Sequence, residues 1–223
     1  MVPMSSPPAA PAGPGAPGPP GTPGRRQRTP SSEIERELIA AAEVVLIRDG
    51  PGAVTVRAVA AEAGIAPMGV YNRLGGKDGL VDALLIRGFD ALRASIAGGD
   101  QRDALERLRA CGVRYRTFAL TNRHYYAIMF EGALPHGFDS PEVSEHAIAA
   151  FGELVRQVEL AAAAGVIRAP EPNETAQQIW STVHGAVTLE LQGLVLTPDP
   201  EATYQATLDT LLRGLAPSGL TPA

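Results

Sequence analysis

The sequence predicts an all-α protein of about nine helices, and three observations lead to this fold class. Apolar residues recur every three or four positions, which is the period of one face of an α-helix. Clusters of Gly, Pro and Ser interrupt this pattern at intervals typical of helix ends. No segment alternates apolar and polar residues as a half-buried strand does. We therefore expect a three-helix N-terminal unit followed by a bundle of longer helices.

Four helices are expected over residues 31–97, because turn residues mark their ends. Ser31 and Ser32 precede acidic residues, as at many helix starts, and Gly50 ends the first helix. Thr55 is a typical cap for a short second helix, and Pro67 suits the first turn of a third. The expected helices span 31–49, 56–63, 67–74 and 77–97.

Five further helices are expected over residues 100–216, which we interpret as a second domain. Their expected ranges are about 105–118, 124–130, 141–164, 173–196 and 200–215. On the last helix Leu208, Leu211 and Leu215 form an apolar stripe. We expect this stripe and the preceding helix, about 174–196, to pair with a second copy of the chain.

The composition is that of a globular protein without a membrane span. Hydrophobic residues make up 45% of the 223 positions and charged residues 19%. No apolar run is long enough for a transmembrane helix, and the N-terminus lacks the apolar core of a signal peptide. The single cysteine, Cys111, excludes an internal disulfide bond. These features predict a protein of the reducing cytoplasm.

Residues 56–75 have the spacing of a helix-turn-helix. Its two helices cross closely, so the first needs a small residue, which Ala60 supplies. The turn needs a residue that tolerates positive φ, which Gly64 supplies, and Val70 faces the first helix. A small core is completed by Val59, Ala63, Ile65 and Leu74. The alternative is a plain helical hairpin inside a bundle, but the joint spacing favours the DNA-binding motif.

Residues 33–93 resemble the N-terminal domain of the TetR family of regulators. The matching residues are Ala41, Ala42, Gly50, Thr55, Val56, Val59, Ala60, Ala63, Gly64, Ile65, Gly69, Val70, Tyr71, Lys77, Asp78 and Leu80. The resemblance implies a homodimer that binds a palindromic operator, with repression as the family default. It also implies a C-terminal domain that senses a small molecule. We assign residues 31–93 to DNA binding and 100–216 to ligand binding and dimerisation.

Ten residues are expected to contact double-stranded DNA. Thr55, Tyr71 and Lys77 are placed to hold phosphates, although Tyr71 as a core residue and Lys77 as a solvated one are the alternatives. Arg57 and Arg73 flank the third helix. Base edges would be read by Ala66, Pro67, Met68, Gly69 and Asn72, of which Asn72 alone can make a bidentate contact. The family usually has Ser or Thr near Ala66, an aromatic residue at Leu74 and a polar residue or Pro at Gly75, so the operator sequence stays open.

Charge and the N-terminal tail bear on the same function. The net charge of −5 taken alone argues against nucleic-acid binding, but residues 25–98 hold 10 Lys and Arg against 9 Asp and Glu. Residues 1–30 are expected to be a disordered tail, with nine Pro and five Gly in the first 24 positions. Arg25, Arg26 and Arg28 at its end form either a solvated segment or an arm that enters the minor groove.

The segment from Trp180 to Gly185 resembles the C-terminal domain of a TetR subgroup named for its Trp-His-Gly signature. Trp180 and His184 lie four residues apart, on one helical face. The implied pocket for a small apolar or amphipathic effector would be lined by Tyr115, Phe118, Met129, Phe130, Trp180 and His184. The alternative is that all six are ordinary core residues.

No pattern predicts an enzyme, a cofactor or a metal site. His184 has no metal-ligating residue three or four positions away. Glu142 and His146 have such spacing, but a third ligand is missing, so surface solvation is expected. Phosphate-binding glycine loops and nucleophile elbows are absent from the sequence. The competing hypothesis is a helical protein that binds a small molecule and has lost DNA binding, which the acidic charge and the apolar third helix favour.

Overall fold

The computed structural model describes residues 31–97, 99, 103–132 and 140–217, and over these residues the chain is α-helical with no strand. The nine helices are α1 (Ser31–Asp49), α2 (Val56–Glu62), α3 (Pro67–Leu74), α4 (Lys77–Ala97), α5 (Ala104–Thr121), α6 (Arg123–Phe130), α7 (Pro141–Ala163), α8 (Pro172–Leu191) and α9 (Pro200–Gly214), with a short 3₁₀ turn, η1 (Pro51–Ala53), after α1. The predicted all-α fold is confirmed. The predicted tail and its arginines lie outside the described residues.

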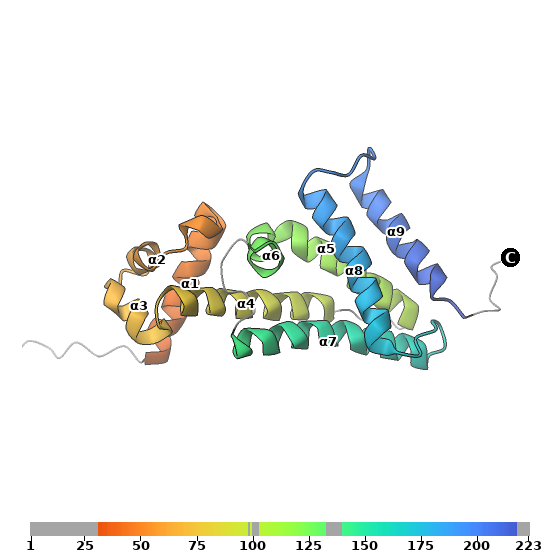
Figure 1. The fold of residues 1–223 in the computed structure, drawn as a ribbon, viewed down its shortest axis with the longest axis horizontal. Helices are drawn as coiled ribbons and strands as arrows, with labels where there is room; N and C mark the ends of the chain where they lie inside the picture. Colours follow the sequence, from red (N-terminus) through yellow and green to blue (C-terminus); the bar gives the residue numbers. More distant parts are fainter. Residues whose placement is uncertain (1–30, 98, 100–102, 133–139, 218–223) are drawn as a thin grey trace, which may run out of the picture.

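Two groups of helices share the long helix α4 (Figure 1). Helices α1, α2 and α3, here called the N-terminal unit, gather at one end of the molecule, and the first half of α4 packs against them. The second half of α4 runs beside α7, and α5, α6, α8 and α9 complete the helical bundle. Helix α4 therefore connects the bundle to the N-terminal unit.

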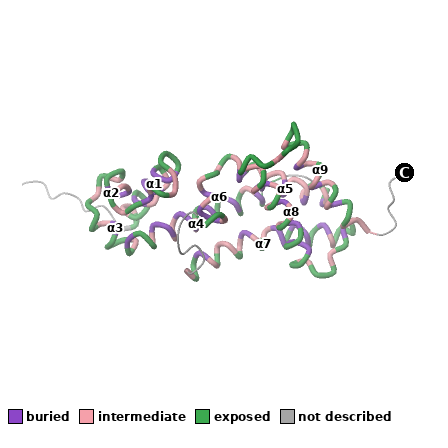
Figure 2. Tube along the Cα trace, turned by 45° about the horizontal axis from the view of Figure 1, so that its top comes forward, coloured by how far each residue is buried: buried purple, intermediate pink, exposed green. Residues whose placement is uncertain are grey.

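The core is continuous from one group to the other. In the N-terminal unit it begins with Leu38, Val45, Val59 and Val70, all fully buried. Along α4 the buried positions follow the helical period from Leu80 to Ile96, and Figure 2 shows buried segments alternating with exposed ones along the helices. Among the described helices, none combines the length and apolarity needed to cross a membrane.

The predicted end of α8 was wrong by five residues. The helix stops at Leu191, and Gly193 follows with φ 70°. The amide of Leu194 donates to the carbonyl of Leu189 at 2.8 Å, which is the closing bond of a Schellman motif. Leu194, Val195 and Leu196 had extended the apolar period, but they lie in the following loop, where Leu196 is 98% exposed.

The apolar stripe expected on α9 is divided between two faces. Leu208 is buried within its own chain, packed over Gly112 of α5, and Leu212 is buried beside it. Leu211 and Leu215 are only partly buried. Tyr204, Leu208 and Leu212 follow a spacing of four residues, so they share the inner face. Leu208 is therefore unavailable for pairing with a second copy, which corrects the prediction.

Candidate functional site

The geometry of α2 and α3 follows from three residues, Ala60, Gly64 and Val70. Ala60 and Val70 are buried where the two helices meet. Gly64 adopts φ 65°, and the next amide, of Ile65, donates to the carbonyl of Ala60 at 2.9 Å. These contacts end α2 in a Schellman turn and send the chain at once into α3. The arrangement is that of a helix-turn-helix.

The outer face of α3 lies on the surface at the end of the molecule (Figures 1 and 2). Met68 is 65% exposed and Tyr71 55%. The other predicted contact residues in this region that are exposed are Thr55, Arg57, Ala66, Pro67, Asn72, Arg73 and Lys77. Gly69 differs, because it is half-buried and a Cβ built on it would lie 2.6 Å from Ile65 Cγ2. Gly69 therefore serves close packing at the turn, and its expected exposure was wrong.

The predicted phosphate-binding residues occupy three separate positions around α3. The Thr55 hydroxyl oxygen accepts a bond from the amide of Ala58 at 3.2 Å, which caps α2 as expected and leaves the hydroxyl proton free to donate. Lys77 is the first residue of α4, and its ammonium makes no ion pair within the described part of the chain. Tyr71 lies near the end of α3, above the start of α4.

Two glycines, Gly76 in the turn after α3 and Gly79 in the first turn of α4, allow α3 and α4 to pack closely. A Cβ on Gly76 would lie 3.0 Å from the Tyr71 ring, so the ring covers this glycine. A Cβ on Gly79 would lie 1.6 Å from the carbonyl oxygen of Leu74, a distance that no side chain can accept. Gly79 therefore allows α4 to pass directly beneath the last turn of α3. The angle between α3 and α4 distinguishes it from an ordinary helix-weakening glycine.

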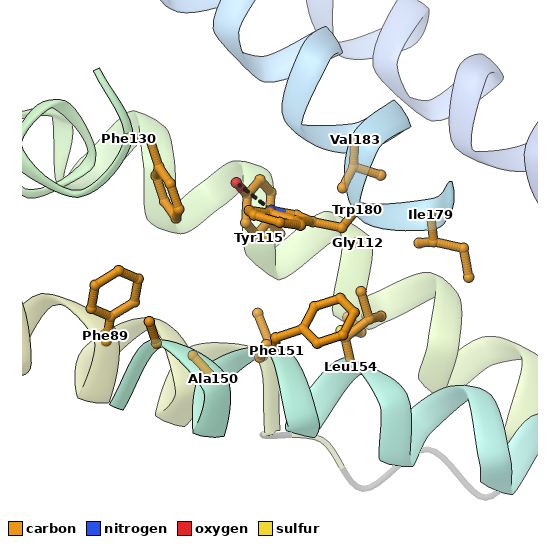
Figure 3. A pocket seen from close by; sticks show the side chains of 13 residues that line it. Phe89, Gly112, Tyr115, Phe130, Ala150, Phe151, Leu154, Ile179, Trp180 and Val183 are labelled. Carbon is orange, nitrogen blue, oxygen red and sulfur yellow. Dashed lines mark hydrogen bonds between the residues drawn. The ribbon is translucent and has the colours of Figure 1, made fainter. Parts of the chain in front are cut away.

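A cavity of about 90 Å³ lies in the bundle, between α4, α5, α6, α7 and α8 (Figure 3). Its aromatic wall residues come from five helices, and small residues of α5 and α7 leave the space between them. The lining residues are Phe89, Ile96, Cys111, Gly112, Tyr115, Phe130, Ala147, Ala150, Phe151, Leu154, Ile179, Trp180 and Val183. None of these described residues carries a charge.

A polar network lies at one wall of this cavity. Trp180 Nε1 donates to the Tyr115 hydroxyl at 3.3 Å, and that hydroxyl lies 2.8 Å from His184 Nδ1. The Tyr126 hydroxyl lies 2.9 Å from the same nitrogen and 3.2 Å from Thr188 Oγ1. Burial lowers the pKa of His184, so its ring is neutral at pH 7 and Nδ1 can accept a hydrogen bond from a tyrosine hydroxyl. Burial also raises the pKa of Tyr115 and of Tyr126.

The predicted ligand residues divide into two groups. Tyr115, Phe130 and Trp180 line the cavity, whereas Phe118, Met129 and His184 do not. Phe118 is buried elsewhere in the core, and Met129 packs over Gly88 of α4. Phe89, Phe151 and all the aliphatic lining residues were not predicted from the sequence. Their helical spacing predicted burial, but spacing does not tell a filled core from the wall of a void.

One further contact joins the bundle to the N-terminal unit. The hydroxyl of Tyr125, on α6, donates to the Glu43 carboxylate, on α1, at 2.9 Å. Arg87, on α4, pairs with the other oxygen of Glu43 at 3.0 Å. Since α6 also carries Phe130 of the cavity wall, a single short helix touches both the cavity and α1. The sequence analysis did not predict this contact between Tyr125, Glu43 and Arg87.

The structure contains no candidate metal centre in its described part, where no three His, Cys, Asp or Glu residues converge. Glu142 is exposed, as expected. His146 was expected to be solvated, but its Nδ1 lies 2.7 Å from a carboxylate oxygen of Asp90 on α4. This pair links α4 and α7 at the surface.

Two family models match the chain. The model described as bacterial regulatory proteins, tetR family, matches residues 38–84, and the model described as tetracyclin repressor-like, C-terminal domain, matches residues 108–211. The first covers most of the N-terminal unit and the start of α4. The second begins in α5 and ends in α9. The finer assignment to a Trp-His-Gly subgroup stays a prediction.

Solved structures share this fold over most of the chain. A protein of unknown function from Rhodococcus sp. RHA1 is 31% identical, with 82% of this chain and 96% of that chain covered and a TM-score of 0.74. A bacterial regulatory protein in the tetR family from Rhodococcus RHA1 is 23% identical, with 82% and 97% covered and a TM-score of 0.60. The SmeT–triclosan complex is 20% identical, with 85% and 94% covered and a TM-score of 0.61. A comparison with curated proteins gives no match.

Proposed function

Because the chain belongs to the TetR family of bacterial regulators, we propose that it is a repressor that binds a palindromic operator as a homodimer and leaves it when an effector fills the cavity. The family is one of DNA-binding transcription regulators rather than enzymes, as the sequence predicted. The observation that carries the proposal is the exposed face of α3, held by the turn at Gly64 and by Gly79 beneath it. Such a regulator acts in the cytoplasm, where the DNA is.

In this proposal α3 enters the major groove and its neighbours hold the backbone. Lys77 and the Thr55 hydroxyl lie at the first residue of α4 and the cap of α2, where positive helix ends favour phosphate. Asn72 is the one exposed amide on α3 and suits adenine. Met68 and Ala66 offer methyl groups to thymine. Arg57, on α2, and Arg73, in the last turn of α3, are exposed and would add contacts to phosphate or guanine.

Dimerisation through α8 and α9 is supported by what their outer faces expose. On α8, Leu189 is 48% exposed and Gly185, one turn earlier, is exposed as well. On α9, the small residue Ala206 is exposed. Shallow hollows in this surface include Thr182 and Leu211 among their lining residues. A two-fold pairing of α8 and α9 with their copies would bury this face in a four-helix interface.

Effector response is supported by the two helices that touch both the cavity and the N-terminal unit. Phe89 lies on α4, which begins at Lys77, and Phe130 lies on α6, which holds α1 through Tyr125. A molecule that separates α4 from α6 would shift the two α3 helices of a dimer relative to each other. A DNA palindrome fixes their separation at about one helical turn, so a shift weakens binding. A structure with this fold, SmeT, is a complex with triclosan.

The test is fluorescence anisotropy with labelled DNA from upstream of the gene that encodes the chain, over a range of salt concentrations. We expect tight binding of two chains per site and a steep loss of affinity with salt. The rival function, a small-molecule-binding protein without DNA affinity, is favoured by the net charge of −5. It predicts no difference between this DNA and a scrambled duplex at any salt concentration.

A further inference from the structure

The cavity wall is built almost entirely of rings and hydrocarbon groups. Phe89 and Phe130 meet edge to face with their centroids 6.0 Å apart. The ring centroid of Trp180 lies 6.1 Å from that of Phe130 and 5.9 Å from that of Phe151. Figure 3 shows these side chains around one space, with Phe89 and Phe151 on the side opposite Trp180. A guest molecule would thus be in contact with aromatic surface on several sides.

The polar groups of this wall already have partners in the protein. The indole N–H of Trp180 is donated to Tyr115, and the Tyr115 hydroxyl is bonded to His184. The carbonyl of Gly112 accepts a bond from the Tyr204 hydroxyl at 2.6 Å. The Cys111 thiol is neutral, because burial raises its pKa to about 12. A polar guest would have to break one of these bonds or leave its own group unpaired.

The size of the cavity limits the guest to a small molecule. An apolar cavity of roughly 150 Å³ in another protein holds benzene. The 90 Å³ present here therefore limits the guest to about one ring, which enters with a small outward movement of the wall. The small side chains of Ala147 and Ala150 create this space, since they face the rings from α7.

We propose that the effector is an uncharged, hydrocarbon-like molecule of about one ring, held by contacts with Phe89, Phe130, Phe151 and Trp180 and by no hydrogen bond. This inference rests on the proposed function, in which the cavity is the effector site. The class is narrower than the apolar or amphipathic effector predicted from the sequence, because the polar groups of two predicted pocket residues, Tyr115 and His184, are bonded to each other. A carboxylate would lose its water with no charged lining residue in the described structure to replace it.

Trp180 supplies the measurement, because it is the single tryptophan of the chain and lies on the cavity wall. Its fluorescence is followed in the full chain, excited at the red edge of its absorption, during titration with toluene, phenol or benzoate. We expect saturable binding of toluene, binding of phenol weaker by roughly 10- to 100-fold, and none of benzoate. The reason is that an apolar site disfavours a hydroxyl group that it cannot pair.

Two variants test the site itself. Ala150→Leu fills the cavity and should abolish the toluene response, whereas Ala163→Leu, at an exposed position of the same helix, should leave it unchanged. Tyr115→Phe removes the hydroxyl without changing the ring and should leave toluene affinity within about twofold. Circular dichroism checks that each variant is folded, and the ligand series on the unaltered chain stands without them.

The outcomes separate this inference from the proposed function. Phenol or benzoate binding more tightly than toluene, or phenol affinity falling on Tyr115→Phe, would overturn the apolar class by making Tyr115 an anchor. No response to any of the three probes would overturn it as well. Anisotropy with operator DNA is measured separately. Toluene that binds without changing operator affinity supports the ligand class and refutes the effector role of the cavity, whereas failure of the DNA to bind refutes the proposed function alone.

Discussion

The N-terminal unit and the bundle place their functional residues by opposite means. In the N-terminal unit the backbone sets the geometry, through the left-handed turn at Gly64 and the close passage at Gly79, and most side chains of α3 are exposed. In the bundle the side chains set the geometry, because five helices contribute rings to one cavity. The first surface should therefore tolerate changes of exposed side chains and fail on changes of glycine. The second should be sensitive to changes in the size of the side chains that line the cavity.

The largest expected effect is that of Gly79→Ala. The added Cβ meets the Leu74 carbonyl oxygen at 1.6 Å, so α3 and α4 must move apart. We expect operator affinity to fall by roughly 100-fold or more, because a contact helix displaced by about 1 Å loses its base contacts together. The measurement is anisotropy with operator DNA, alongside thermal unfolding.

Gly152→Ala is the matched control for that change. Gly152 is an exposed residue inside α7, and a Cβ there meets nothing within 4 Å. The same substitution should stabilise the chain by about 0.5–1 kcal/mol and leave DNA binding unchanged. Equal losses of operator affinity in both variants would show that the backbone contact at Gly79 is not what places α3.

A smaller effect is expected for Lys77→Ala. One cation is lost from each copy, so a dimer should bind every DNA sequence roughly 10-fold more weakly at low salt, and the slope of log affinity against log salt should decrease by about 2. Arg213→Ala removes the same charge from an exposed site on α9 and should leave the slope unaltered. An unchanged slope in Lys77→Ala would place this lysine away from phosphate.

Glu43→Gln tests the contact that joins the two regions. The change removes the ion pair with Arg87 and weakens the bond from Tyr125. We expect operator affinity without effector to change less than about threefold, while the loss of affinity caused by toluene shrinks several-fold, consistent with about 0.5–2 kcal/mol of coupling. Glu37→Gln, at an exposed position of α1, is the control. If both variants respond to effector as the unaltered chain does, α6 does not transmit the signal.

The smallest effect concerns pH and is confined to the bundle. Burial lowers the pKa of His184 below its ordinary value of 6.5, so the unfolded chain binds this proton more readily than the folded chain. The free energy of unfolding should therefore fall as the pH drops below about 6.5, and be fully restored above it. Denaturant unfolding of the chain and of His184→Gln between pH 5 and 7.5 measures this, and the variant should show a shallower dependence. A steeper pH dependence in the variant would show that folding raises the pKa of His184 instead of lowering it.

The sequence predicted helix ends correctly where a glycine or proline is compatible with few conformations other than a turn or a helix start. A glycine four residues after Ala60 and a proline at position 67 left few alternatives to a short turn between helices, and the structure has that turn. The ends of α3 and α4 were predicted for the same reason. The end of α8 was missed because three apolar residues after Gly193 continued the helical period, although they lie in a loop.

The sequence by itself determined the fold class, the order of the helices and the position of α3, because periodicity, caps and turn glycines act over a few residues. The tertiary structure decided which buried residues surround a void. Phe118 and Phe151 both fit the helical period, but only Phe151 lines the cavity. It also decided that His184 bonds to two tyrosines and that Gly79 must lack a side chain. The cavity and the bonds of His184 depend on the distance between segments far apart in the chain, which is set by the packing of whole helices rather than by local sequence. The contact of Gly79 is with Leu74, five residues earlier, and depends on the angle at which α4 leaves α3.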